Sequence, residues 1–237
     1  MAESAVSGKE FESPSPKIPS PVATQEPGKG IPWVFLWAVL LLAPAFYWDE
    51  DVIGWVRSNV TPGSLWVAEV VSKLLDWPPV LAFLGGVYFA VCRWGPKDYR
   101  RWVGMAFLGA ALCGATGTLL RSVIGRARPS AAVEQGWYGP YHDGRWTIGR
   151  HDYAAFPSGH TSTVAGAAGV LILARRRWGA LALALTLLVG CSRIILLAHR
   201  LSDVVAAALL GLVGGAWIWR RWGGVSPKPQ ADEPAIR

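Results

Sequence analysis

The sequence is poor in charged residues. Only 16% of its 237 residues are Asp, Glu, Lys or Arg, whereas soluble globular domains average about 25%. Hydrophobic types make up 52% of the chain, and Trp occurs 14 times. So apolar a composition excludes an intrinsically disordered chain and argues against a water-soluble globule. The sequence therefore predicts a membrane protein.

Cysteine is also scarce, and familiar ligand-binding motifs are missing. Cys92, Cys113 and Cys191 are scattered through apolar segments, and their spacing fits neither a zinc site nor a disulfide framework. We interpret them as small core residues. The sequence has no glycine-rich phosphate-binding loop. A net charge of +7 would suggest nucleic acid in a soluble protein, but the arginines cluster beside apolar segments, so we expect membrane lipids and no nucleic acid as partners.

Apolar segments predict the fold class, an all-α polytopic membrane bundle with about six transmembrane helices. Each segment is near the about 20 residues that cross the hydrocarbon core, and Trp residues at their ends are typical of the membrane interface. The segments cover residues 31–48, 77–93, 102–124, 159–174, 178–197 and 201–219. In residues 61–75, Trp66, Val70 and Leu74 are four apart, which predicts an extracytoplasmic amphipathic helix on the membrane surface.

The two ends of the chain differ from its middle. Residues 1–30 are polar and proline-rich, and residues 224–237 are polar. We expect both to be flexible tails around a membrane domain at 31–223. No small-residue cleavage site follows the first apolar segment, so we expect a retained span and not a cleaved signal peptide.

Basic residues predict the orientation of the bundle, because cytoplasmic linkers carry an excess of Lys and Arg. The linkers after the second and fourth predicted spans are rich in Lys and Arg, whereas the linker after the first contains Asp49, Glu50, Asp51, Glu69 and Asp76. We therefore expect a multi-pass protein of the cell (inner) membrane. Both termini would face the cytoplasm, and the first, third and fifth linkers would face outside.

Several ionisable residues lie where a membrane span disfavours them. A charge at the centre of a span costs about 2.5–3.5 kcal/mol. In the predicted orientation, Arg121, Arg193, His199 and Asp203 lie at the outer ends of spans, and His160 begins a span on the same side. Snorkelling to the interface explains one such residue but not the set. The sequence thus predicts one polar site at the outer membrane face.

The spacing of these residues suits an anion site. Arg121 and Arg128 are seven residues apart, about two helical turns, and two fixed cations suit a phosphate group. Ser158 is a candidate N-cap, and Gly159 allows a ligand to approach the free N–H groups of a first helical turn. A basic juxtamembrane cluster and an ordinary helix start are the simpler readings of these two patterns.

His199 and Asp203 are four residues apart on one predicted helix, so their side chains can meet. A carboxylate that fixes the imidazole tautomer makes the histidine a nucleophile or a base. A satisfied structural pair is the alternative. Arg193 lies six residues before His199 and cannot share its face on a continuous helix, so we expect a break near Leu197-Ala198.

Taken together, three blocks resemble the signature of the type-2 phosphatidic acid phosphatase and vanadium haloperoxidase superfamily, in its integral-membrane lipid phosphatase branch. The blocks are Arg121-x6-Arg128-Pro129, Pro157-Ser158-Gly159-His160 and Ser192-Arg193-x5-His199-x3-Asp203. The family usually has Lys at the position of Arg121. The charge is kept, but a planar guanidinium replaces a compact ammonium.

The resemblance implies roles for individual residues. Phosphate binding would fall to Arg121, Arg128, Ser158, Gly159 and Arg193. His199 would attack phosphorus to form a phosphohistidine, Asp203 would orient His199, and His160 would protonate the leaving oxygen and then assist water. No metal and no cofactor are implied, which agrees with the lack of a carboxylate cluster in the sequence.

A site at the outer bilayer surface favours a lipid phosphate as substrate. Isoprenyl diphosphate, phosphatidylglycerophosphate, phosphatidic acid and lipid A phosphate all qualify, and the sequence predicts neither one of them nor an oligomeric state. Alternatives are a lipid phosphotransferase, a vanadate-dependent haloperoxidase, against which six spans argue, and a non-enzymatic lipid or anion transporter. The segment 130–156 fits either a lid or a packed outer loop, and we place its His142 and His151 outside the site.

Overall fold

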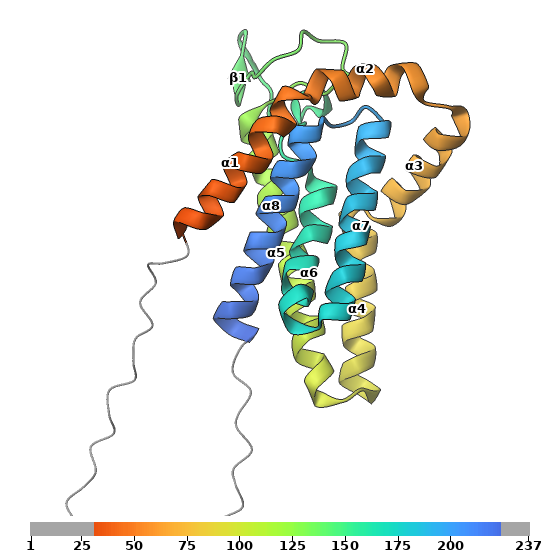
Figure 1. Cartoon of the computed structure of the whole chain (residues 1–237), viewed down its shortest axis with the longest axis vertical. Coiled ribbons are helices and arrows are strands. Elements are labelled where there is room, and N and C mark those ends of the chain that lie inside the picture. The colour runs from red at the N-terminus through yellow and green to blue at the C-terminus, as the bar shows by residue number, and fades with distance from the viewer. Residues whose placement is uncertain (1–30, 224–237) are drawn as a thin grey trace, which may run out of the picture.

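Helices make up most of the described chain (Figure 1). The computed structural model describes residues 31–223, with side chains from residue 36 onward. The predicted tails at 1–30 and 224–237 lie outside the described residues. The helices are α1 (Ile31–Tyr47), α2 (Asp49–Asn59), α3 (Pro62–Leu74), α4 (Trp77–Trp94), α5 (Lys97–Ile124), α6 (Gly159–Ala174), α7 (Arg176–Ile195) and α8 (Leu201–Ile218). The remaining elements are strands β1 (Tyr141–His142) and β2 (Arg145–Trp146), the 3₁₀ turn η1 (His151–Tyr153) and the π-helical turn η2 (Trp219–Gly223).

The predicted all-α membrane bundle is confirmed. Within residues 31–223, α5, α7 and α8 with its extension to Gly223 are long and apolar enough to cross a membrane. The pair α3 and α4, bent by 50°, adds a fourth span if the two helices cross together. The apolar helices α1 and α6 are shorter, with 17 and 16 residues. The count of six spans therefore stays a prediction.

The linker after α1 holds more helix than the sequence pattern indicated. The predicted amphipathic helix at 61–75 is α3, and it begins at a capping box in which Thr61 and Ser64 exchange hydrogen bonds between side chain and backbone N–H. The preceding helix, α2, was not predicted. Figure 1 shows α2 lying across one end of the bundle, beside the loop that carries β1. We call this the site end.

The core is built around α6, which packs against α5, α7 and α8. From Gly159 to Leu171 every residue of α6 except His160 is buried. A helix that is buried on all sides has no polar face turned to solvent. Most residues of α6 are small, and Ala165, Ala167, Ala168 and Val170 are buried in the middle of this helix.

Glycines allow α6 to approach its neighbours closely. A Cβ added to Gly109 of α5 would stand 2.6 Å from the carbonyl oxygen of Gly166. A Cβ on Gly166 would collide with the carbonyl oxygen of Gly109, and one on Gly215 of α8 with that of Gly166. Such small-residue contacts are how helices pack tightly in membranes. They set the distances from the middle of α6 to α5 and α8.

We expect Gly166→Ala to lower the thermal unfolding temperature of the detergent-purified protein by several degrees, because overpacking a tight contact costs about 1–3 kcal/mol. Gly86→Ala on α4 is the matched control, since an added Cβ there meets nothing within 4 Å. It should leave the unfolding temperature unchanged or slightly raised. Equal stability of the two variants would contradict the close packing of α6 against α5 and α8 at Gly166.

Candidate active site

The predicted site residues meet at the site end of the bundle. Arg121 lies in the last turn of α5, Ser158 and His160 at the start of α6, Arg193 in the last turn of α7 and Asp203 in the first turn of α8. Arg128 belongs to the segment between α5 and α6, residues 125–158, which we call the site loop. His199 lies between α7 and α8.

Three arginines form a positively charged cluster. The Nε atoms of Arg128 and Arg193 are buried and have no hydrogen-bond partner among the described residues. Burial, together with the charges of Arg193 and Arg121, lowers the pKa of Arg128 to about 10, so this guanidinium is still cationic at neutral pH. A buried cation is costly unless it is paired. A cluster of this kind suits an anion as a ligand.

The first turn of α6 lies against this cluster. The guanidinium of Arg121 lies 3.1 Å from the place where a Cβ on Gly159 would stand, so a larger residue would displace the arginine. Ser158 is the N-cap residue, as predicted, but its side chain makes no capping hydrogen bond. Its Oγ instead accepts from Thr161 Oγ1 at 3.1 Å. The N–H groups of Gly159 and His160 have no acceptor within the helix and suit an anion.

His199 is wholly buried and held through its Nδ1 atom. Nδ1 lies 2.7 Å from the carbonyl oxygen of Ala155. A carbonyl only accepts, so Nδ1 carries the proton and Nε2 keeps its lone pair. Nε2 is buried and has no partner among the described residues. Burial lowers the pKa of His199 to about 4 against the opposite effect of Asp203, which keeps the imidazole neutral at pH 7.

The sequence suggested that Asp203 orients His199 by a direct hydrogen bond, but the structure has no such bond between them. Asp203 Oδ2 lies 3.8 Å from His199 Nδ1, too far for a hydrogen bond. Oδ2 accepts instead from the backbone N–H of Arg200 at 2.7 Å, and Oδ1 accepts from Arg126 at 2.5 Å. The carbonyl of Ala155 therefore fixes the tautomer, and Asp203 supplies a negative charge nearby.

The predicted helix break is confirmed. Helix α7 ends at Ile195, and Leu197 has a φ of 51°, in the region that non-glycine residues rarely adopt. The N–H groups of Ala198 and His199 both donate to the carbonyl of Arg193, at 3.1 and 3.2 Å. This tight turn brings Arg193 and His199 to the same place.

The bend between α3 and α4 also reaches the site. Asp76 accepts from the N–H of Trp77 at the start of α4, and its Oδ1 lies 3.1 Å from His160 Nε2. From α3, Ser72 Oγ accepts from Arg193 at 2.6 Å. The sequence marked Asp76 only as an acidic linker residue, because no periodicity links it to His160.

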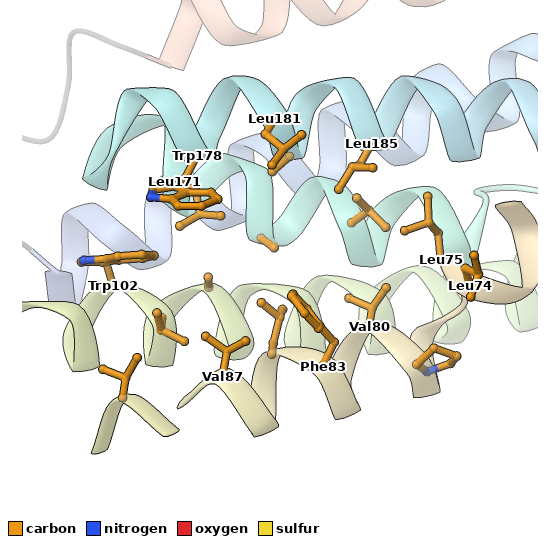
Figure 2. Close-up of a pocket in the computed structure, with 18 of the residues that line it drawn as sticks. Leu74, Leu75, Val80, Phe83, Val87, Trp102, Leu171, Trp178, Leu181 and Leu185 are labelled. Atoms are coloured by element: carbon orange, nitrogen blue, oxygen red, sulfur yellow. The ribbon is translucent and has the colours of Figure 1, made fainter. Parts of the chain in front are cut away.

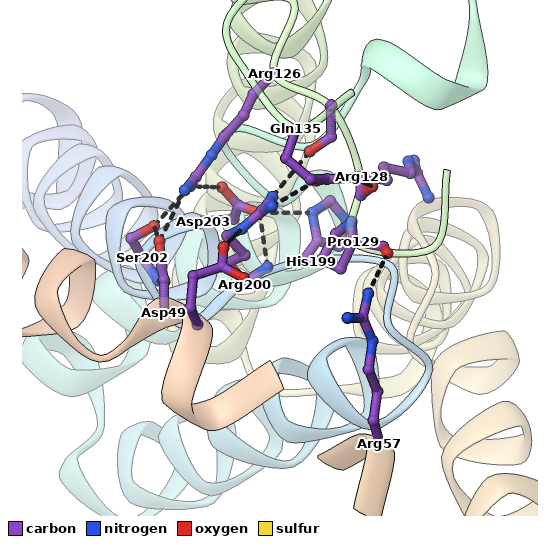
Figure 3. A network of polar contacts seen from close by, with 12 residues as sticks. Asp49, Arg57, Arg126, Arg128, Pro129, Gln135, His199, Arg200, Ser202 and Asp203 are labelled. Atoms are coloured by element: carbon purple, nitrogen blue, oxygen red, sulfur yellow. Dashed lines mark hydrogen bonds and ion pairs between the residues drawn. The ribbon is translucent and has the colours of Figure 1, made fainter. Parts of the chain in front are cut away.

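The site loop is packed where it covers the site. Arg128 is 5% exposed and Ala127 is fully buried. Arg200 donates to the carbonyl of Ala127 and to the side chain of Gln135, which ties the loop to the start of α8 (Figure 3). The hairpin of β1 and β2 is exposed. This arrangement favours the packed loop over the lid for residues near Arg128.

The histidines of the site loop lie outside the arginine cluster. His142 is paired with its neighbour Asp143 at 3.2 Å on the exposed hairpin. His151 is largely exposed. Its pKa is lowered, chiefly by the positive charge of Arg128. His151 is therefore within electrostatic reach of the cluster.

An apolar groove of about 520 Å³ runs along the bundle between α4, α5, α6 and α7. Leu74 and Leu75 line one end, next to the bend that carries Asp76. Phe83, Leu181 and Leu185 project into its middle, and Trp102 lies toward the other end (Figure 2). The groove thus begins beside the residue that contacts His160.

Among residues 31–223, no group of three or more His, Cys, Asp or Glu side chains is placed to hold a metal ion. The positive charge of the described site comes from arginine side chains and from the first turn of α6.

Comparison with known proteins places these observations in a family. The model of the PAP2 superfamily matches residues 102–225. Lipid A 1-phosphatases of Rhizobium johnstonii and Rhizobium etli are 36% and 35% identical to this chain over 124 residues. The match covers 50% of this chain and 46% and 48% of theirs, so the chain spans about half the length of these curated relatives.

A solved structure shares the fold. The crystal structure of the first transmembrane PAP2 type phosphatidylglycerolphosphate phosphatase from Bacillus subtilis has a TM-score of 0.55 and 20% sequence identity. The likeness covers 82% of this chain and 96% of that one. Residues 102–225 are more than half of the chain and include every predicted site residue. The chain therefore belongs to the PAP2 superfamily.

Proposed function

We propose that this protein is a membrane lipid phosphatase that works through a phosphohistidine on His199. The observation that carries the proposal is the buried Nε2 of His199, which, like the Nε atoms of Arg128 and Arg193, has no hydrogen-bond partner within residues 31–223. A lone pair beside convergent cations is what nucleophilic attack on a phosphate requires. A structural His–Asp pair would have its polar atoms satisfied.

The arginines and the first turn of α6 would bind the phosphate. Guanidinium groups of Arg121, Arg128 and Arg193 match phosphate oxygens in shape and charge. Ser158 and the N–H of Gly159 would complete the set. Charge that develops on the equatorial oxygens in the transition state would then meet preorganised donors.

The reaction would proceed in two steps. His199 Nε2 attacks phosphorus, the P–N bond forms as the P–O bond to the lipid breaks, and His160 gives a proton to the leaving oxygen. Water then attacks the phosphohistidine, and His160 takes a proton from it. Inorganic phosphate leaves, and both histidines return to their first state. The negative charge of Asp203 near His199 stabilises the imidazolium of the intermediate.

The apolar groove supports a lipid as the substrate. Its end at Leu74 and Leu75 lies beside Asp76, so a phosphate in the site and an alkyl chain in the groove could belong to one molecule. The curated relatives are lipid A 1-phosphatases and the similar structure is a phosphatidylglycerolphosphate phosphatase. We propose a lipid phosphomonoester or diphosphate of this class. The same site would also serve a lipid phosphotransferase.

The location of the site on the outer face of the cell membrane is part of the proposal, and cysteine labelling tests it. In a variant without the native cysteines, a thiol reagent that cannot cross membranes should label Ser130→Cys in intact cells and not Lys97→Cys. Both positions are exposed: Lys97 begins α5, and Ser130 lies in the site loop beyond the other end of that helix. Labelling of both in opened cells is the control. The reverse pattern in intact cells would place the site in the cytoplasm.

Metal independence is a second expected outcome, because the positive charge at the site comes from arginines. Phosphate release from lipid substrates in detergent should persist in excess EDTA. Vanadate, which mimics five-coordinate phosphorus, should inhibit it. Activity that disappears with EDTA and returns with Mg²⁺ would contradict the mechanism.

The two histidines should differ in their dependence on the leaving group. His199→Ala should abolish phosphoenzyme formation from every substrate. His160→Ala should lose about 10²–10⁴-fold on a lipid monophosphate, whose alkoxide leaves poorly without a proton. With p-nitrophenyl phosphate, whose phenolate leaves readily, it should still form the phosphoenzyme. Rapid-quench trapping of phosphohistidine measures this step directly.

His142→Ala is the matched control for both histidine variants, because His142 is exposed on the hairpin of the site loop. It should behave as the wild type with either substrate. Equal losses of His160→Ala on both substrates would rule out the acid role. Trapped phosphoenzyme in His199→Ala would show that the nucleophile is another residue.

A further inference from the structure

Arg126 occupies one of the six unspecified positions of the first signature block, yet it is among the most connected residues near the site. It follows Gly125, whose φ of 66° ends α5, and its own side chain is 9% exposed. The guanidinium stacks on the ring of Trp137, with its Cζ atom 4.6 Å from the ring centre. A cation buried in this way requires charged partners.

The partners of the guanidinium are two buried carboxylates. Nη1 donates to Asp203 Oδ1 at 2.5 Å and to Ser202 Oγ at 2.7 Å, and Nη2 donates to Asp49 Oδ2 at 2.8 Å. Figure 3 shows Arg126 reaching Asp203 on one side and Asp49 and Ser202 on the other. A planar guanidinium can serve both carboxylates at once, which the compact ammonium of Lys cannot do with the same geometry.

The backbone of Arg126 reaches the other partner of His199. Its carbonyl accepts from the N–H of Ala155 at 3.1 Å, and the carbonyl of Ala155 accepts from His199 Nδ1 at 2.7 Å. Arg126 therefore holds, through its side chain and its backbone, both groups that face His199 Nδ1.

Asp49 anchors this arrangement from the start of α2. It is 3% exposed, and it accepts from the N–H of Ser202 at 2.8 Å and from Ser202 Oγ at 2.6 Å. Ser202 directly precedes Asp203, so Asp49 fixes the first turn of α8 as well as the guanidinium. Without Asp49, a buried arginine would face the carboxylate of Asp203 alone.

We propose that Arg126 and Asp49 are positioning residues for the nucleophile. They hold Asp203 and the carbonyl of Ala155 so that His199 keeps its proton on Nδ1 and its Nε2 lone pair toward the phosphate. This inference rests on the proposed function for its catalytic meaning, but the orientation of His199 is measurable by itself.

The first test reads the tautomer of His199 directly. The chain has four histidines, so selective ¹⁵N labelling of histidine gives a spectrum that His199→Ala assigns. In the wild type, His199 should be a single neutral tautomer with its proton on Nδ1. In Arg126→Gln and in Asp49→Asn the segment at Arg126 loses its anchor to α2 and α8, so the hydrogen bond from His199 Nδ1 to the carbonyl of Ala155 should weaken and the spectrum should show a mixture of tautomers. An unchanged single tautomer in both variants would overturn the proposal.

The second test separates positioning from phosphate binding. Arg126→Gln should slow phosphohistidine formation about 10²-fold, because a misplacement of about 1 Å has this effect. Vanadate affinity should change less than threefold, since Arg121, Arg128 and Arg193 are untouched. Arg126→Lys should recover part of the rate. A fall in vanadate affinity as large as the fall in rate would overturn the proposal, since Arg126 would then serve the anion.

Arg57→Gln is the matched control. Arg57 also contacts the site loop, through a hydrogen bond of 3.1 Å to the carbonyl of Pro129, but it touches neither Asp203 nor Ala155. It should keep the wild-type tautomer and rate. Asp49→Asn is isosteric and carries both tests if Arg126→Gln does not fold. A wild type that forms no phosphohistidine would end the proposed function, whereas the tautomer spectra would still decide the role of Arg126.

Discussion

Buried positive charge is the constraint on which this site depends. Within residues 31–223, the Nε atoms of Arg128 and Arg193 have no acceptor, and the lone pair of His199 Nε2 has no donor. Leaving such groups desolvated is unfavourable. The cluster is tolerated because the packing of α5, α6, α7 and α8 holds it in place. Under the proposed function, a bound phosphate would supply the missing partners.

Two kinds of interaction maintain this state, and they lie in different parts of the molecule. In the bundle, glycine contacts such as Gly109 with Gly166 set the distances between helices. At the site end, Arg126 of the site loop forms ion pairs with Asp49 of α2 and with Asp203 of α8. The first kind fixes where the helix ends stand, and the second fixes how individual side chains turn. The proposed chemistry at His199 would require both.

The sequence predicted the parts of this structure that follow from local patterns. The length of the apolar segments predicted most of the helices, the spacing of Arg193 and His199 predicted the break before α8, and the distribution of charge placed the signature residues at one end. It did not give Arg126 with Asp49, which are 77 residues apart, or the bond from His199 to the carbonyl of Ala155. Contacts between residues that are distant in the sequence, and hydrogen bonds accepted by backbone carbonyls, leave no periodic pattern in the sequence. Asp76 beside His160 was missed for the same reason.

The burial of α6 on every side has a consequence for how relatives of this protein can diverge. Because its residues from Gly159 to Leu171 contact neighbouring helices closely, few substitutions there fit without moving a helix end. Substitutions that leave the bundle intact fit more readily in the groove lining of α4 and α7 and on the exposed hairpin of the site loop. Under the proposed function, the groove lining is also the part of the protein that would contact the lipid chain.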